Sequence, residues 1–332
     1  MDTLQQETRE ILTVSDNALT LEHVTKRYSG HTAVDDLSLE VPRGIIYGIL
    51  GPNGAGKSTT LRMIMNIIAR DDGRIELLGA DPARDREVAR RVGYLPEERG
   101  LYRKMKVLDV IVFFARLKGM DGKAARRDGR EWLERMSLDE WADSKVETLS
   151  KGMQQKVQFI TTVMHRPEML ILDEPQSGLD PVNQEILRET ILSAKAEGRT
   201  VLLSTHYMDE AQRMCDAVCI IAHGRKILDG KVRDVRRAHR RNRYFIEFDE
   251  RTDAVQRFFR TNGLLAAVHG RDHGWEVEPM PGVATDELLA AVAALDSPVA
   301  RFEHMLPSLH DIFVEQVKGA AQPIRRAEAV HA

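Results

Sequence analysis

A glycine-rich loop at residues 51–58, with the sequence GPNGAGKS, constrains this chain more than any other feature. It satisfies the pattern G-x-x-x-x-G-K-[ST] and lies between the apolar run Ile45 to Leu50 and a helix-forming stretch that starts at Lys57. Strand, loop and helix in this order are the context that the pattern requires. Glycines at these positions let successive backbone N–H groups turn toward phosphate oxygens. The loop therefore predicts a site for a nucleoside triphosphate.

Each part of this loop has an expected contact with the nucleotide. The helix N-terminus adds its positive dipole end, Lys57 reaches the β- and γ-phosphates, and the Ser58 hydroxyl ligates Mg²⁺. The expected nucleotide-binding residues of the loop are Gly51, Pro52, Asn53, Gly54, Ala55, Gly56, Lys57, Ser58 and Thr59.

A pair of carboxylates follows a second apolar strand, Met169 to Leu172. Apolar residues on both sides of this strand predict that it is buried on both faces, so that Asp173 and Glu174 emerge at its end. Asp173 is placed to hold Mg²⁺, directly or through water, and Glu174 to orient and deprotonate the attacking water. Two acids at a strand end can also cap the following helix, but the phosphate-binding loop favours a hydrolytic site.

The helix that leads into this strand opens with LSKGMQQK at residues 149–156, and from here the sequence resembles the ATP-binding cassette (ABC) family. The resemblance covers about residues 19–240. It includes SGLD at residues 177–180 as the D-loop, which ends at Asp180. It also includes His206 as the switch histidine after a strand and Tyr28 as the aromatic that stacks on adenine. The resemblance implies that the cofactors are ATP and Mg²⁺ and that His206 serves hydrolysis.

The signature at residues 149–156 also implies a partner. In the ABC family two subunits enclose two ATP molecules, so that Ser150 and Gly152 of one chain contact the γ-phosphate bound by Lys57 of the other. The family signature is usually LSGGQ, and Lys151 and Met153 replace its first Gly and its Gln here. Ser150 and Gly152, the positions that approach phosphate, are retained. The resemblance therefore implies a dimer, expected here to be a homodimer.

A second departure from the family lies in GYLPEER at residues 93–99. The family commonly has Gln after the Pro, and this chain has Glu97. A carboxylate can ligate Mg²⁺ but repels the γ-phosphate at the same distance. Glu97 is therefore expected to belong to the metal and catalytic site, and its role there is left open.

The alternation of strands and helices predicts an α/β fold. The expected core is a P-loop NTPase of the ABC type at residues 19–240, with an antiparallel β-subdomain and a helical insert at about residues 97–167. Seven of the thirteen residues 231–243 are basic, and the boundary is placed there. Residues 241–318 follow the order βαββαβ, which indicates a small ferredoxin-like α+β domain. Tails are expected at residues 1–18 and 319–332.

Charge and hydropathy exclude several other functions. The chain has 48 Lys and Arg against 51 Asp and Glu, so its net charge of −3 gives no overall attraction for nucleic acid or anionic lipid. The apolar stretches Leu61 to Ala69 and Val107 to Leu117 are shorter than the ~20 residues that span a bilayer. The polar start of the chain does not suggest a secretory signal, and the two cysteines, Cys215 and Cys219, suit a reducing cytosol.

Three features together narrow the branch of the family. LPEERGLY at residues 95–102, the signature LSKGMQQK and the appended domain resemble the ABC-2-type exporter ATPases, near the sodium-efflux ATP-binding subunits. The resemblance implies an ATPase subunit, peripheral at the cytoplasmic face of the membrane, that dimerises around two Mg-ATP and drives a separately encoded permease. The alternative is a soluble cassette ATPase that acts on nucleic acid or ribosomes through the basic linker. A small-molecule sensor in the C-terminal domain would add to the first interpretation.

Overall fold

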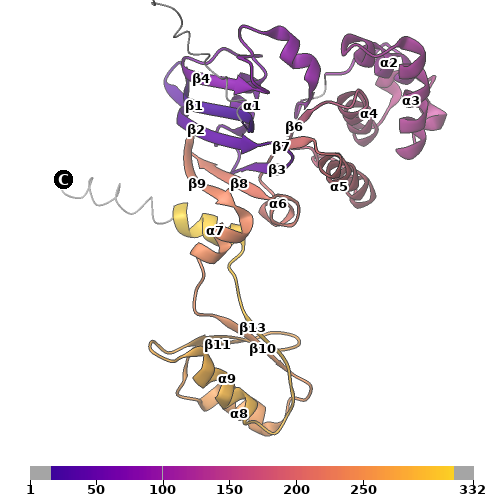
Figure 1. Cartoon of the computed structure of the whole chain (residues 1–332). Coiled ribbons are helices and arrows are strands. Elements are labelled where there is room, and N and C mark those ends of the chain that lie inside the picture. The colour runs from indigo at the N-terminus through magenta and orange to yellow at the C-terminus, as the bar shows by residue number, and fades with distance from the viewer. Residues whose placement is uncertain (1–15, 99, 318–332) are drawn as a thin grey trace, which may run out of the picture. The chain divides into compact units, whose positions relative to one another are not determined.

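The computed structural model describes residues 16–98 and 100–317. The chain forms two compact units, Met1–Val232 and Arg233–Ala332, which Figure 1 shows coloured along the sequence. The expected tails lie outside the described residues, apart from residues 16–18. No helix in the described part of the chain is long and apolar enough to cross a membrane.

Two sheets build the first unit. An antiparallel sheet with the order β2-β1-β4 consists of β1 (Asn17–Tyr28), β2 (His31–Pro42) and β4 (Asp72–Leu77). The larger sheet has the order β5-β6-β7-β3-β8-β9. Its strands are β3 (Ile46–Leu50), β5 (Val92–Leu95), β6 (Met169–Asp173), β7 (Thr200–Thr205), β8 (Ala217–Ala222) and β9 (Arg225–Lys231). The five neighbouring strands β5, β6, β7, β3 and β8 run parallel to one another. Every residue of β3, β6 and β7 is buried, as expected for largely apolar strands covered on both faces of a parallel sheet.

The helices of the first unit fall into two groups. Three of them, α1 (Lys57–Ile64), α5 (Pro181–Ala196) and α6 (Met208–Met214), alternate with the parallel strands. The helical insert contains α2 (Val107–Leu117) and α3 (Gly122–Arg135), which lie together with α4 (Lys151–Val163) to one side of the larger sheet (Figure 1). Short 3₁₀ turns complete the unit at η1 (Arg86–Arg91), η2 (Asp139–Trp141) and η3 (Val146–Thr148).

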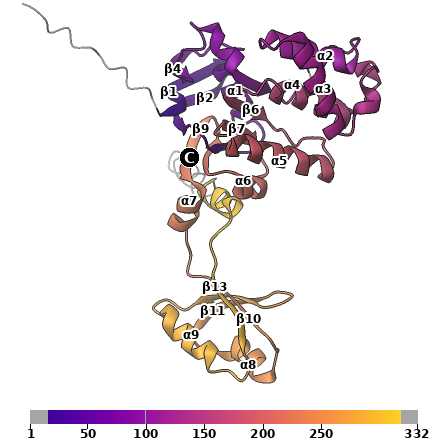
Figure 2. The same ribbon diagram turned by 45° about the vertical axis from the view of Figure 1, so that its right-hand side comes forward.

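The second unit contains one antiparallel sheet with two helices on one face (Figure 2). The sheet and these helices are β10 (Tyr244–Phe248), α8 (Asp253–Thr261), β11 (Leu265–Gly270), β12 (Trp275–Pro279), α9 (Thr285–Ala293) and β13 (Val299–His304). The strand order β11-β12-β10-β13 is the ferredoxin-like arrangement. Tyr244, Ile246 and Val277 of the sheet pack with Phe259 of α8 and Leu288 of α9 in a separate core. The expected fold class, an α/β core with an appended α+β domain, is confirmed.

A helix at the division between the units, α7 (Val232–Ala238), packs with the helix at residues 309–317. The Arg236 guanidinium donates to the Pro307 carbonyl at 2.9 Å, and Arg241 forms a 2.7 Å ion pair with Glu315. These contacts are formed by the basic stretch that the sequence suggested as a linker. The residues that make these contacts belong to the second unit, Arg233–Ala332.

Candidate functional site

The phosphate loop, residues 51–58, joins the end of β3 to the start of α1. Gly56 caps α1 with a φ of 103°, a left-handed backbone conformation that favours glycine. A Cβ atom at Gly56 would also lie 2.4 Å from the Ala33 carbonyl oxygen, so a side chain is excluded there by contact as well. The loop therefore keeps the first N–H groups of α1 open to an anion.

A cavity of about 560 Å³ opens over this loop. It brings together most of the residues that the sequence predicted to bind nucleotide, although they lie far apart in the chain. Its lining consists of Tyr28, His31, Ala33, residues 53–59, Glu97 and Glu174. The Tyr28 side chain is half exposed, as a ring that stacks on a base must be before the base arrives.

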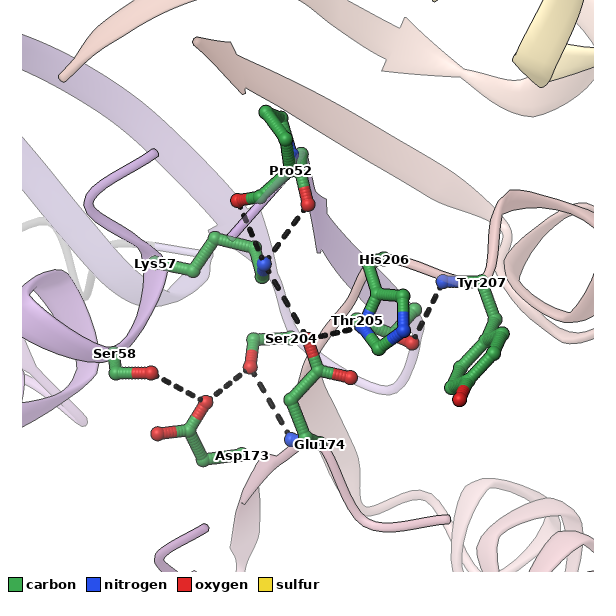
Figure 3. Close-up of polar contacts among 10 residues, drawn as sticks. Pro52, Lys57, Ser58, Asp173, Glu174, Ser204, Thr205, His206 and Tyr207 are labelled. Atoms are coloured by element: carbon green, nitrogen blue, oxygen red, sulfur yellow. Dashed lines mark hydrogen bonds and ion pairs between the residues drawn. The ribbon is translucent and has the colours of Figure 1, made fainter. Parts of the chain in front are cut away.

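Lys57 is the buried cation of the site, with only 5% of the residue exposed. Its Nζ donates to the carbonyls of Gly51 at 2.8 Å and Pro52 at 3.2 Å, and lies 3.3 Å from Oε1 of Glu174 (Figure 3). These three oxygens compensate the cost of burying the ammonium group. Because Lys57 lies against both the phosphate loop and a carboxylate, it joins the two predicted halves of the site.

Asp173 ends β6 and is fully buried. Its Oδ1 accepts hydrogen bonds from Ser58, at 3.1 Å, and from Ser204 (Figure 3). Burial raises the pKa of the Asp173 carboxyl, and the two serine hydrogen bonds oppose that rise. Its Oδ2 has no hydrogen-bond partner among the described residues. A buried oxygen without a partner beside the Ser58 hydroxyl fits a divalent cation or its water shell.

Glu174 follows Asp173 with a φ of 45° and is 6% exposed. Its backbone N–H donates to the Ser204 carbonyl at 3.1 Å, and its Oε1 accepts from both Lys57 and His206. Nδ1 of His206 lies 3.0 Å from that oxygen. Its Oε2 is buried and without a partner among the described residues. One carboxylate oxygen is thus held in place, and the other is available to accept a proton.

The strand register explains how His206 reaches Glu174. β6 and β7 are parallel neighbours, with Asp173 opposite Ser204, so their ends meet at one edge of the sheet. The Tyr207 ring lies against the His206 ring, tilted by 37° at a centroid distance of 4.0 Å, and the Tyr207 N–H donates to the Thr205 hydroxyl. Asp173 and His206 do not line the cavity themselves but contact residues that do.

The predicted residues of the signature and the D-loop do not line the cavity of their own chain. Ser150 is the N-cap of α4 and accepts from the Met153 N–H, and Asp180 is the N-cap of α5. Gly152 lies in the first turn of α4, where an added Cβ would be 3.4 Å from the Gly178 carbonyl. The signature and the D-loop are therefore neighbours, outside the cavity that contains Lys57.

Sequence reasoning missed two residues that the structure places in or next to the site. Ser204 donates to Asp173 and accepts from the backbone of Glu174, and Gln158 of α4 donates to the backbone on both sides of Glu97. The only signal for Ser204 was a small polar residue at the end of the strand, two positions before His206. Gln158 gave none, because its contact depends on how α4 packs.

A P-loop NTPase is the class of protein that this fold and site define. A family model described as ABC transporter matches residues 34–177, and a model described as the C-terminal domain of DrrA1-3-like ATP-binding proteins matches residues 230–317. The ABC transporter ATP-binding protein YhaQ of Bacillus subtilis is 41% identical over 299 residues, which cover 90% of this chain and 98% of that protein. The chain belongs to the ABC transporter ATP-binding proteins and is an ATPase of that family.

Two further comparisons agree with this assignment. Nod factor export ATP-binding protein I of Burkholderia orbicola is 41% identical over 209 residues, which cover 63% of this chain and 69% of that protein. The solved structure of an ATP-binding subunit of an ABC transporter matches with a TM-score of 0.63 and 32% identity, over 67% of this chain and 92% of the other. The predicted family and ATPase class are confirmed.

Proposed function

We propose that this chain is the ATP-hydrolysing subunit of an exporter, that it dimerises around two Mg-ATP, and that it drives a separately encoded membrane permease. One observation carries the hydrolytic part of the proposal. Beside the phosphate loop, Lys57 and His206 both bind Oε1 of Glu174, while Oε2 of Glu174 and Oδ2 of Asp173 are buried without partners in the described structure. This arrangement supports a water held between a base and a phosphate.

The residues of the site have distinct roles in this proposal. The N–H groups at the start of α1 and the Lys57 ammonium bind the β- and γ-phosphates, and Tyr28 stacks on adenine. Oε2 of Glu174 accepts the proton of the attacking water, and His206 keeps the carboxylate in that orientation through Oε1. A bound phosphate would compete with Oε1 of Glu174 for the Lys57 ammonium.

Mg²⁺ fits the oxygen-rich side of the same site. Ser58 and Asp173 would hold it, because their oxygens lie within hydrogen-bond distance and Oδ2 of Asp173 is unpaired. Glu97 lines the cavity and would complete the shell in place of the usual Gln. When bound, Mg²⁺ neutralises charge on the β- and γ-phosphate oxygens.

The placement of Ser150, Gly152 and Asp180 supports the dimer. They lie outside the cavity of their own chain, with two helix N-termini at Ser150 and Asp180 turned to no phosphate of that cavity. A second copy in the reverse orientation would supply the phosphate that Ser150 and Gly152 lack. A homodimer is the simplest assembly that satisfies both copies.

The helical insert supports a membrane partner. Tyr102 and Phe113 pack edge to face at a centroid distance of 5.3 Å, and 53% of Tyr102 and 56% of Leu117 are exposed. Exposed aromatic and aliphatic side chains grouped in this way are typical of a contact surface. We assign it to the permease, which would hold this subunit at the cytoplasmic face of the membrane.

Export rather than another cassette function is favoured by the relatives and by the basic stretch. The name of the Burkholderia relative states export of a Nod factor. The alternative, action on nucleic acid or ribosomes, relied on the basic residues after 230. Arg236 and Arg241 of that stretch are bound within the second unit, which reduces the cationic surface offered to a polyanion.

The variant Glu174→Gln tests the proposal directly. It keeps the shape of the side chain and removes the base, so Mg-ATP hydrolysis should fall by about 10²–10⁴-fold while ATP binding persists. In analytical ultracentrifugation with Mg-ATP the variant should accumulate as a dimer. Glu131→Gln, at an exposed position of α3, is the control and should hydrolyse at the parent rate. Hydrolysis at the parent rate by Glu174→Gln would show that another group is the base.

A further inference from the structure

Gln158 connects α4 to the loop that carries Glu97. Its side chain is buried, and its Nε2 donates to the carbonyl of Pro96 at 3.3 Å and to the carbonyl of Glu98 at 3.1 Å. If the amide were turned round, its Oε1 would face the two carbonyl oxygens, which cannot donate a hydrogen bond. The atom that faces them must therefore be the nitrogen. The two acceptors flank Glu97, whose side chain lines the nucleotide cavity.

The contact continues along the same face of α4. Thr162, one turn beyond Gln158, has its hydroxyl 3.4 Å from the Tyr94 carbonyl of β5. At Gly93 of that strand an added Cβ would lie 2.3 Å from the Thr162 carbonyl oxygen, so no side chain separates helix and strand. A displacement of α4 must therefore displace β5 and the Glu97 loop, or break these hydrogen bonds.

The other end of α4 is the Ser150 N-cap. Gln158 lies eight residues further along the helix, which is about 12 Å at 1.5 Å per residue. In the proposed dimer Ser150 faces the nucleotide bound by the partner. In that dimer α4 thus extends from the partner's nucleotide to the Glu97 loop of this chain's own site.

The chemistry of Gln158 also argues for a specific role. Its Oε1 is buried and has no hydrogen-bond partner among the described residues. A leucine or methionine of similar size would fill the same volume without burying an unpaired acceptor. If Gln158 served packing alone, its amide would therefore cost more folding free energy than an apolar side chain. An apolar residue could not replace the two hydrogen bonds that the amide donates.

We propose that Gln158 is a positioning residue that holds Glu97 in the nucleotide site through the backbone of Pro96 and Glu98, and that makes Glu97 respond to movement of α4. Through this link, engagement of Ser150 by the partner's nucleotide adjusts the metal and phosphate environment of the chain's own site. The response between the two sites rests on the dimer of the proposed function. The link from Gln158 to Glu97 is present within one chain.

Gln158→Leu in the full chain tests this link. Affinity for ATP without Mg²⁺ should stay at the parent value, while the gain in affinity on adding Mg²⁺ should shrink about threefold. The kcat for Mg-ATP hydrolysis should fall about tenfold, and the ATP dependence of hydrolysis should lose its cooperativity. Lys156→Met is the matched control, because Lys156 also lies on α4 but donates to the Met136 carbonyl inside the helical insert.

A double-mutant cycle with Glu97→Ala separates positioning from stability. If Gln158 acts through Glu97, adding Gln158→Leu to Glu97→Ala should cause no further loss of kcat or of the Mg²⁺-dependent affinity. Gln158→Asn, whose shorter amide can reach one carbonyl at most, should give an intermediate loss. If circular dichroism shows that Gln158→Leu is unfolded, Gln158→Asn is measured in its place.

Two results would overturn the inference: parent values of kcat and Mg²⁺-dependent affinity in the folded variants, or fully additive losses in the cycle. Failure of the proposed function would give a different result, because the parent chain itself would then show no Mg-ATP hydrolysis or no ATP-dependent dimer. The Mg²⁺-dependent affinity of a single chain still measures the link in that case.

Discussion

Buried carboxylates occur in both units of the chain, but their surroundings differ. In the first unit Asp173 and Glu174 each retain one buried oxygen without a partner in the described structure, beside the Lys57 ammonium. In the second unit Glu276 is 8% exposed, and both of its oxygens are bound, to Arg271 at 2.6 Å and to Arg243 at 3.5 Å. A buried acid with all its oxygens bound stabilises a fold, whereas one with a free oxygen faces a ligand.

The sheets explain this difference. Parallel strands direct their carboxyl ends to the same edge, so β3, β6 and β7 collect the phosphate loop, the carboxylates and His206 at one place. The second unit has an antiparallel sheet, in which successive strands end at opposite edges. Its charged residues consequently meet across neighbouring strands as ion pairs, which contribute little when exposed.

The largest effect expected from this comparison is that of Lys57→Ala. The triphosphate would lose its buried cation, and Glu174 would lose an ion pair, so affinity for ATP should fall about a hundredfold or more. Isothermal titration with Mg-ATP measures it. Lys195→Ala is the control, because Lys195 pairs with Asp216 and lines no part of the cavity. If Lys57→Ala bound Mg-ATP with the parent affinity, the phosphate loop would not be part of the nucleotide-binding site.

A smaller effect is expected from Ser204→Ala. The hydroxyl donates to Asp173 and lies 3.4 Å from the Glu174 N–H, and loss of such a hydrogen bond costs about 1 kcal/mol. The pKa of Asp173 should then rise further, because one of the hydrogen bonds that lowers it is gone. Steady-state kinetics should show kcat/KM reduced about fivefold. The exposed Ser193→Ala should leave it unchanged; an equal loss there would indicate a general effect on the fold.

Local patterns in the sequence were sufficient for part of this site. The phosphate loop and the Asp173-Glu174 pair are each continuous in the chain, so strand, loop and carboxylates could be predicted from neighbouring residues alone. The ferredoxin-like order of the second unit was likewise readable from strand and helix patterns. Roles of Tyr28 and His206 came from the family resemblance rather than from local chemistry.

Contacts between distant segments could not be predicted in the same way. Ser204 meets Asp173 across 31 residues through the β6–β7 register, and Gln158 meets the Glu98 carbonyl across 60 residues through helix packing. Within the second unit, Arg236 and Arg241 bind residues about 70 positions later in the chain. The composition of residues 231–243 showed a basic stretch but could not show which residues its arginines bind.

The smallest effect should follow from removing the second unit. The residues assigned to phosphate, metal and base all lie in the first unit, and the second has its own core around Tyr244 and Ile246. A chain that ends at Val232 should therefore bind Mg-ATP within about twofold of the parent affinity, since neither desolvation nor charge in the cavity changes.

Dimer formation should respond more than binding to the same truncation. An appended domain can add contact area beyond the nucleotide sandwich, and a stable specific interface needs roughly 1,000 Å² or more. Ultracentrifugation of both chains with and without Mg-ATP compares their association, and nucleotide-induced shifts of the thermal transition show that the shorter chain is folded. The full chain with Ile246→Asp, which disrupts the second core without truncation, should behave like the shorter chain. A large loss of ATP affinity in both variants would mean that the second unit supports the nucleotide site. The presence or absence of an unpaired carboxylate oxygen would then no longer distinguish residues of the ligand site from residues that only stabilise the fold.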